Sequence, residues 1–154
     1  MPQRRPLLRL WTLLLIPLLA LLAGAAALLL TYWLRVAPFR GESFDVARWH
    51  DAQRCDPQLS PADCRRHQSQ CLRGPMVEDL VTSHLQRARS DRTATRQFLG
   101  PPERTGALTL ADRQFDDCDF YPLGACSLFG VDESQLYICF TADQTIDRAG
   151  PIRP

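Results

Sequence analysis

The sequence contains no lysine, because all 18 of its basic residues are arginine. We interpret this bias as an effect of genomic base composition, since the arginines form no basic patch. Four of them precede Val36, so the rest of the chain has 14 arginines against 17 acidic residues, a net charge near −3. This balance argues against nucleic acid as a partner.

The sequence also lacks the common patterns of catalytic sites. No Cys-x-x-Cys occurs, which argues against a thiol oxidoreductase. No Gly-x-Ser-x-Gly or similar nucleophile setting accompanies the scattered histidines His50, His67 and His84. His84 is typical of a partly buried side chain on the mixed face of a helix. We therefore expect no catalytic residues, no cofactor and no bound metal.

Charge is absent from the whole stretch between Leu10 and Leu34. As a helix, these 25 residues span roughly 37 Å at about 1.5 Å per residue, enough to cross a hydrocarbon core of about 30 Å. Trp11 at one end, and Tyr32 and Trp33 at the other, are typical of the membrane interface. Residues 10–34 are therefore predicted to be an anchor that contacts membrane lipid.

A cleaved signal peptide is the alternative, with Arg4, Arg5 and Arg9 as its charged region. In that case the mature protein begins near residue 27. The apolar run is longer than the roughly 7 to 15 residues usual for a signal peptide, which favours an uncleaved anchor. No cysteine follows the run closely, so a lipoprotein anchor is disfavoured.

All six cysteines follow the apolar segment, at Cys55, Cys64, Cys71, Cys118, Cys126 and Cys139. An even number in a domain of this size predicts three structural disulfides and an oxidising compartment. We therefore expect a single-pass protein of the bacterial inner membrane, with residues 1–9 cytoplasmic and the C-terminal domain periplasmic. Fifteen pairings are possible. We favour local bonds, of Cys55 or Cys64 with Cys71 and of Cys118 with Cys126 or Cys139.

A metal site is the alternative interpretation of the first three cysteines. The spacing Cys-x2-His-x3-Cys can bring Cys64, His67 and Cys71 to one side of a helix, with Cys55 as a further ligand. The paired Cys-x2-Cys knuckles of ordinary zinc modules are missing, which favours disulfides.

The segment "DRQFDDCDF" contains four aspartates, Asp112, Asp116, Asp117 and Asp119. It lacks the regular alternation of oxygen ligands and the glycine of a calcium loop. We therefore predict a solvated strand edge, where charge discourages pairing with another strand.

The sequence after the anchor predicts an α+β fold. Residues 35–54 form a linker and a lead-in helix capped near Ser43, and residues 55–73 form a cysteine-rich insert with a helix starting at Ser60. Residues 74–154 form the main domain, with an amphipathic helix over about 75–88 and a second over about 92–99. Strands are predicted in "RQFDDCDFYPLG", "ESQLYICFTA" and "QTIDRA". Two or three helices then pack on an antiparallel sheet of about three strands.

The segment "DRTATRQFLGPP" has the signals of a short, sharply terminated helix. Asp91 is predicted to cap the first free N–H groups, and Phe98 and Leu99 to lie on the buried side with Thr95. Gly100 suits the left-handed position after a helix, and the prolines that follow prevent its continuation.

A helix, a short helix ending in "LGPP", a strand with "YPLG" and a strand of the form L-x-I-x-F together resemble the SmpA/OmlA domain over about residues 74–149. The resemblance places Asp91 at the cap, Phe98 and Leu99 at the double leucine, and Gly100 and Pro102 at the closing positions. It places Tyr121 and Gly124 at the "YPLG" corner. The chain departs from the family pattern at Arg89, Ser90, Ala94 and Thr95, and it lacks the cysteine that carries the lipid.

Domains of this family pack two helices on a three-stranded antiparallel sheet and bind other proteins without a cofactor. They are related in fold to the β-lactamase inhibitor proteins. The resemblance thus implies a non-catalytic protein that binds another envelope protein. Apolar residues in loops indicate the exposed sheet face or the edge near Tyr121 and Phe129 as the interaction surface. The alternatives are a metal-binding or thiol-redox protein that uses Cys55, Cys64, His67 and Cys71, and a secreted inhibitor-like protein released by signal cleavage.

Overall fold

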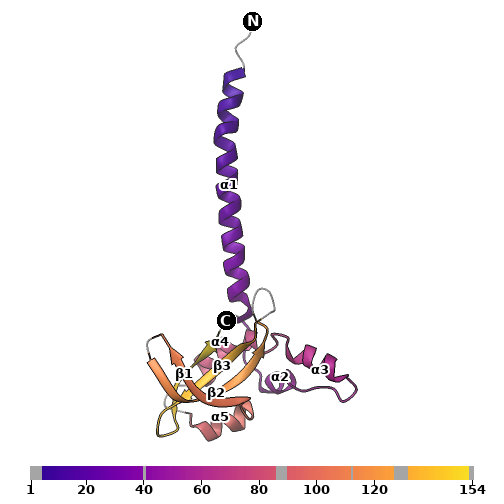
Figure 1. The fold of residues 1–154 in the computed structure, drawn as a ribbon, viewed down its shortest axis with the longest axis vertical. Helices are drawn as coiled ribbons and strands as arrows, with labels where there is room; N and C mark the ends of the chain where they lie inside the picture. The colour runs from indigo at the N-terminus through magenta and orange to yellow at the C-terminus, as the bar shows by residue number, and fades with distance from the viewer. Residues whose placement is uncertain (1–4, 40, 86–89, 112, 127–131, 153–154) are drawn as a thin grey trace. The chain divides into compact units, whose positions relative to one another are not determined.

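The computed structural model describes the chain outside residues 1–4, 40, 86–89, 112, 127–131 and 153–154 (Figure 1). The chain divides into two compact units, residues 1–36 and 37–154. The first contains the helix α1 (Arg5–Val36), and the second contains every other described element.

Helix α1 runs for 32 residues and includes Pro17. Its segment Leu15–Trp33 is 19 residues long and apolar enough to cross a membrane. The Thr31 hydroxyl donates to the Ala27 carbonyl oxygen at 2.7 Å, so this polar group is satisfied within the helix. By length and composition α1 fits a membrane anchor and equally a signal sequence.

The second unit confirms the predicted α+β class. Its helical elements are η1 (Ala37–Phe39), α2 (Val46–Asp51), α3 (Pro61–Gln68), η2 (Gly74–Met76), α4 (Val77–Asp79), the π-helical turn η3 (Leu80–His84) and α5 (Arg92–Leu99). Its strands are β1 (Arg104–Leu110), β2 (Arg113–Gly124), β3 (Ser134–Phe140) and β4 (Ile146–Ile152).

The four strands form one antiparallel sheet in the order β1-β2-β3-β4. The prediction of about three strands missed β1. Its residues, "RTGALTL", include a glycine and none of them is fully buried, so the apolar pattern typical of a strand is weak, and its pairing with β2 shifts register between Gly106 and Leu108. β2 has 12 residues and lies between β1 and β3, so it is an interior strand.

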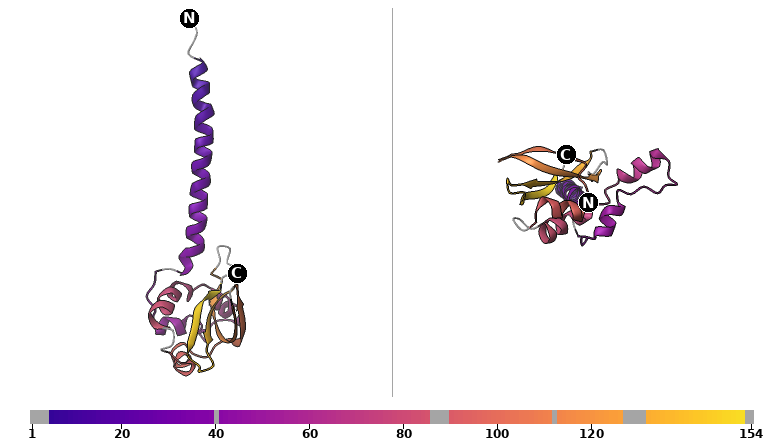
Figure 2. Two further views of the ribbon diagram at one scale, coloured as in Figure 1. Left: turned by 90° about the vertical axis from the view of Figure 1, so that its left-hand side faces the viewer. Right: turned by 90° about the horizontal axis from the view of Figure 1, so that it is seen from below.

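The helices gather on one face of the sheet, and α3 projects from the rest of the unit (Figures 1 and 2). The main core lies between these helices and the sheet. Its most deeply buried large side chains are Trp49, Tyr121, Met76, Leu80, Leu99, Leu123, Leu136, Ile138 and Ile146.

The opposite face of the sheet has a second buried cluster, formed by Phe115, Cys118, Phe120, Tyr137 and Cys139. The Cys118–Cys139 disulfide joins β2 to β3 within it. The guanidinium of Arg104 stacks on the Phe120 ring and that of Arg113 on the Phe115 ring, which shields both rings from water. This face is therefore not the open apolar surface expected for binding a partner.

Helix α5 has the predicted bounds and termini. The Asp91 carboxylate accepts a hydrogen bond from the Ala94 N–H at 2.7 Å, and Gly100 follows the helix with a φ of 87°. Leu99 and Thr95 are buried, and Phe98 packs against the main core. The cap and the glycine act locally, which explains why the sequence predicts this helix well.

Two other helices differ from the prediction. The lead-in helix is capped by Asp45 instead of Ser43 and has six residues. Over its described residues, the expected helix over about 75–88 is a 3₁₀ turn, a single α turn and a π turn, which closes with the Leu85 N–H donating to the Leu80 carbonyl oxygen at 2.9 Å. Residues 86–88 of the expected helix lie outside the described part of the chain. Both of these leucines are buried, so the wider turn keeps Leu85 in the core.

Candidate functional site

Residues 53–71 form a projection that includes α3, and we call it the arm. None of its residues is buried. The helix α3 begins at a Ser60 cap followed by Pro61, as the sequence predicts, so its formation needs no packing against the core. The Cys55–Cys64 disulfide closes the arm internally, and the Cys71–Cys126 disulfide ties its end to the segment after β2.

All six cysteines lie in three disulfides, but the expected local pairing of Cys71 is wrong. Cys55 pairs with Cys64, whereas Cys71 pairs with Cys126 across 55 residues of sequence. The arm returns to the end of β2, where the Ala125 N–H donates to the Ser69 carbonyl oxygen at 2.7 Å. This path brings Cys71 next to Cys126 and away from the first disulfide.

The same pairing removes the alternative metal or thiol-redox cluster. Cys55 and Cys64 share one disulfide and Cys71 belongs to another, so these sulfurs are not free thiolates beside His67. Within the described part of the chain, no three His, Cys, Asp or Glu side chains are placed to hold a metal ion.

Two glycines allow the base of the arm to pack closely on the domain. Gly124 has a φ of 84°, and a Cβ there would overlap the carbonyl oxygen of Gln70. A Cβ at Gly74 would overlap the Cys71 sulfur and lie 2.7 Å from the Cys126 sulfur. Both glycines therefore lie in close contacts beside the disulfide that any other residue would disturb.

We expect Gly124→Ala to lower the free energy of unfolding by at least about 2 kcal/mol. An alanine in the left-handed region costs about 1 to 2 kcal/mol, and the overlap with Gln70 adds to this. Chemical denaturation followed by near-UV circular dichroism measures the loss. Gly106→Ala is the matched control, because a Cβ at Gly106 meets nothing within 4 Å, and it is expected to change stability by less than about 1 kcal/mol. Equal effects of the two substitutions would contradict this account of the arm base.

Arg73 connects both ends of the arm to the domain. Its side chain lies over the Trp49 ring at 4.3 Å, and its Nε donates to the Trp49 carbonyl oxygen at 2.8 Å. A terminal N–H donates to the Pro122 carbonyl oxygen at 3.3 Å. Burial lowers the pKa of Arg73 to about 10, because water is largely excluded from the guanidinium. The charge remains in place at neutral pH and links α2 to β2.

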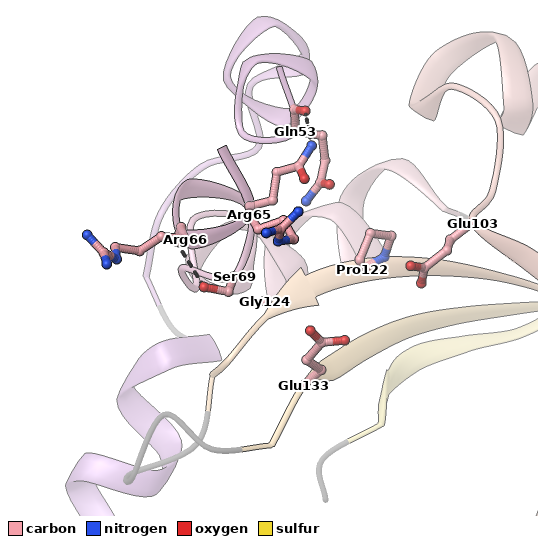
Figure 3. Close-up of a pocket in the computed structure, with 9 residues that line it drawn as sticks. Gln53, Arg65, Arg66, Ser69, Glu103, Pro122, Gly124 and Glu133 are labelled. Atoms are coloured by element: carbon pink, nitrogen blue, oxygen red, sulfur yellow. Dashed lines mark hydrogen bonds between the residues drawn. The ribbon is translucent and has the colours of Figure 1, made fainter. Parts of the chain in front are cut away.

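A polar pocket with a volume of about 460 Å³ lies between the arm and the sheet (Figure 3). Its lining residues are Gln53, Arg65, Arg66, Gln68, Ser69, Glu103, Pro122, Gly124 and Glu133. Arg65 extends from the arm toward Pro122, and Glu133 extends into the same space from the start of β3, while Arg66 points away (Figure 3).

A second polar cluster joins α5 to β2 inside the fold. Asp119 is fully buried and accepts hydrogen bonds from Arg92 at 2.6 Å and from the Nε and a terminal nitrogen of Arg96 at 2.7 and 2.8 Å. Arg92 also donates to Asp117 at 2.6 Å. Burial alone would raise the pKa of Asp119, but the hydrogen bonds from Arg96 and Arg92 outweigh it and hold this pKa below 3.8.

This cluster corrects the prediction of a solvated aspartate-rich edge. β2 is an interior strand, and Asp119 faces α5 instead of water. Asp116 is exposed as expected, and Asp117 is half-buried beside Arg92. Asp112 lies outside the described residues. The signal that was overlooked is the spacing of Arg92 and Arg96, which places both guanidinium groups on one side of α5.

The tyrosine expected at an interacting edge is instead part of the core. Tyr121 is only 1% exposed, and its hydroxyl donates to the Gly100 carbonyl oxygen at 3.3 Å. Burial raises its pKa. Tyr121 thus links β2 to the end of α5 and is not available to a partner, and Phe129 lies outside the described residues. The closing residue Pro102 is half-buried just before β1.

The three histidines have different environments. The Nε2 atom of His50 lies 3.1 Å from the Phe98 carbonyl oxygen, and His67 is half-buried on the arm. The His84 side chain is 39% exposed, packs against the rings of Phe44 and Phe98, and lies 3.7 Å from an Asp79 carboxylate oxygen. His50 and His84 therefore contact the main chain or aromatic rings of the fold.

Comparison of the chain with protein-family models, with curated proteins and with solved structures finds no match.

Proposed function

We propose that this chain is a non-catalytic, membrane-anchored protein of the bacterial envelope that binds another envelope protein through its arm. In this proposal α1 crosses the inner membrane once, and residues 37–154 lie in the periplasm. The observation that carries it is the arm, which is covalently braced and yet contributes no buried residue to the fold.

The two disulfides of the arm stabilise a surface that burial does little to order. Ordering a residue costs about 1 to 2 kcal/mol of conformational entropy, and burial of apolar surface usually offsets that cost. In the arm only Cys71 packs against the main core and no residue is fully buried, so its disulfides hold a largely solvent-exposed surface in one shape. A surface held rigid in advance loses less entropy when a partner binds, which favours an interaction role.

The same bonds support the proposed compartment. Three disulfides, two of them in the core clusters, need an oxidising environment to persist. The apolar helix α1 directly precedes the domain, since only Ala37 and Pro38 separate its last residue from the buried Phe39. An anchored domain in the periplasm accommodates both features.

We also propose that residues 74–154 are a divergent SmpA/OmlA-like domain. In favour of this assignment are the helices on one face of an antiparallel sheet and the short helix that ends in Leu99 and Gly100. The fourth strand, β1, is an addition to the three strands that the resemblance implies. Protein binding without a cofactor is the role that this assignment suggests.

The proposed interaction is tested by site-specific photocrosslinking of the full-length protein in intact cells. A photoreactive residue at the exposed Gln58 of the arm is expected to give a discrete protein adduct, whereas the same residue at the exposed Thr93 of α5 gives none. Mass spectrometry identifies the adduct. Recovery of only lipid or of this chain itself from Gln58 would remove the support for a partner protein.

A secreted form is the second candidate, because α1 meets the length and composition of a signal sequence as well as those of an anchor. It predicts a mature protein that begins near residue 27 and is soluble without detergent. Intact-mass measurement of the protein from the membrane and soluble fractions decides between the two forms.

A further inference from the structure

The pocket at the base of the arm has walls of opposite charge (Figure 3). Arg65 and Arg66 belong to the arm wall, while Glu103 and Glu133 belong to the sheet wall. Arg66 is already paired with Asp63 at 3.6 Å and points out of the pocket. Arg65 on one side, and Glu133 and Glu103 on the other, therefore set the charge pattern of the space itself.

These opposite charges do not neutralise one another across the pocket. Among the described residues, neither Arg65 nor Glu133 forms an ion pair, and Glu103 accepts only a long 3.4 Å hydrogen bond from Gln135. The arm is prevented from closing onto the sheet, because the Cys71–Cys126 disulfide and the contact of Gly124 with Gln70 fix its base. The Gln68 amide also donates to the Gln53 carbonyl oxygen at 2.9 Å, which holds the two sides of the arm together.

We propose that this pocket binds a segment of the partner protein that carries an acidic and a basic side chain close together. The acidic group faces Arg65, and the basic group faces Glu133 and Glu103. A ligand with a single charge would be attracted to one wall and repelled by the other, whereas a dipolar segment satisfies both. The inference rests on the proposed function and specifies the chemistry of the partner.

The volume and the neutral lining agree with a peptide segment. A volume of about 460 Å³ lies within the range of roughly 300 to 1,000 Å³ usual for sites that enclose a small ligand. The side-chain amide of Gln53 offers both a donor and an acceptor, which are the groups needed to bind a peptide bond. Since the pocket opens beside the arm, a segment bound there is continuous with the proposed docking surface.

The test uses the adduct formed by the photoreactive residue at Gln58 in intact cells expressing the full-length protein. Arg65→Glu and Glu133→Arg are each expected to reduce the adduct yield about tenfold, because each turns an attraction into a repulsion. Arg65→Lys keeps the charge and is expected to retain most of the yield. The matched controls, Arg48→Glu on α2 and Asp132→Arg beside Glu133, change charge at exposed positions outside both the arm and the pocket and are expected to leave the yield unchanged.

The double variant Arg65→Glu with Glu133→Arg separates ligand binding from a structural role. The exchange reverses the charge pattern of the pocket, so a dipolar ligand that binds in one direction does not regain its favourable contacts. The adduct yield therefore stays low. Recovery of the yield would show that the two residues serve each other and would overturn the proposal. All variants are expected to keep the thermal unfolding midpoint, since both side chains are exposed.

Two further outcomes would overturn the inference. An adduct that forms normally in both single variants would leave the arm as a binding surface but exclude the pocket from it. Replacement of the protein adduct by a phospholipid adduct that depends on Arg65 would assign the pocket to a zwitterionic headgroup. Loss of every adduct, including that of the unaltered chain, would instead refute the proposed function.

Discussion

Replacement of Asp119 by asparagine is expected to lower the free energy of unfolding by about 3 to 5 kcal/mol. The carboxylate is fully buried and accepts hydrogen bonds from two arginines of α5. Asparagine has nearly the same size but no charge, so Arg92, whose side chain is only 16% exposed, loses its buried counter-ion. The main attachment of α5 to β2 is thereby weakened.

Chemical denaturation of the full-length protein in detergent, followed by near-UV circular dichroism, measures this loss. Asp116→Asn is the matched control, because it makes the same change on the same strand at an exposed position. It is expected to alter stability by less than about 0.5 kcal/mol. A loss of similar size in both variants would contradict the role assigned to the buried cluster.

The stability difference between the unaltered protein and Asp119→Asn has a predictable pH dependence. Because the pKa of Asp119 is below its value of 3.8 in the unfolded chain, its contribution to stability is fully present above about pH 3.8. It is lost as the pH falls through the lower pKa of the folded state. The stability difference between the unaltered protein and Asp119→Asn should therefore be constant near neutral pH and shrink only in acid.

Removal of the Cys71–Cys126 disulfide by paired alanine substitutions is expected to cost roughly 4 kcal/mol. The bond joins residues 55 positions apart, and the entropy lost by the unfolded chain grows with the length of the closed loop. The freed arm should also become more sensitive to trypsin after Arg54, Arg65 and Arg66, since these residues are exposed and the disulfide attaches the arm to the segment after β2.

Paired alanine substitutions at Cys55 and Cys64 are the control for this experiment. Their disulfide spans only nine positions and lies outside the core, so its loss is expected to cost roughly 2 to 3 kcal/mol. Thermal unfolding and limited proteolysis measure both effects. If the short disulfide proved as important as the long one, the arm would depend on its internal bond and not on its attachment to β2.

Several elements were predictable because their signals are local. The cap at Asp91, the glycine at position 100 and the prolines after it define α5 without reference to the rest of the chain. The Ser60 cap and Pro61 define α3 in the same way. Alternating residues such as Leu136 and Ile138 indicated β3, although not that its other face is buried as well.

Other features were not predictable, because they depend on contacts between distant parts of the chain. The wider π turn at Leu80 follows from the need to bury Leu85, and β1 forms because β2 is long enough to pair on both sides. The aspartates around Cys118 looked like an exposed edge, since nothing nearby in the sequence showed that α5 supplies two arginines to Asp119.

The sequence by itself determined the apolar helix α1, the α+β class and the presence of three disulfides, because composition, periodicity and helix caps act over a few residues. Only the tertiary structure decided that Cys71 pairs with Cys126, that Asp119 is buried between two arginines, and that a polar pocket lies between the arm and the sheet. These three features join segments that are far apart in sequence. Their geometry depends on the path of the chain, which no local pattern encodes.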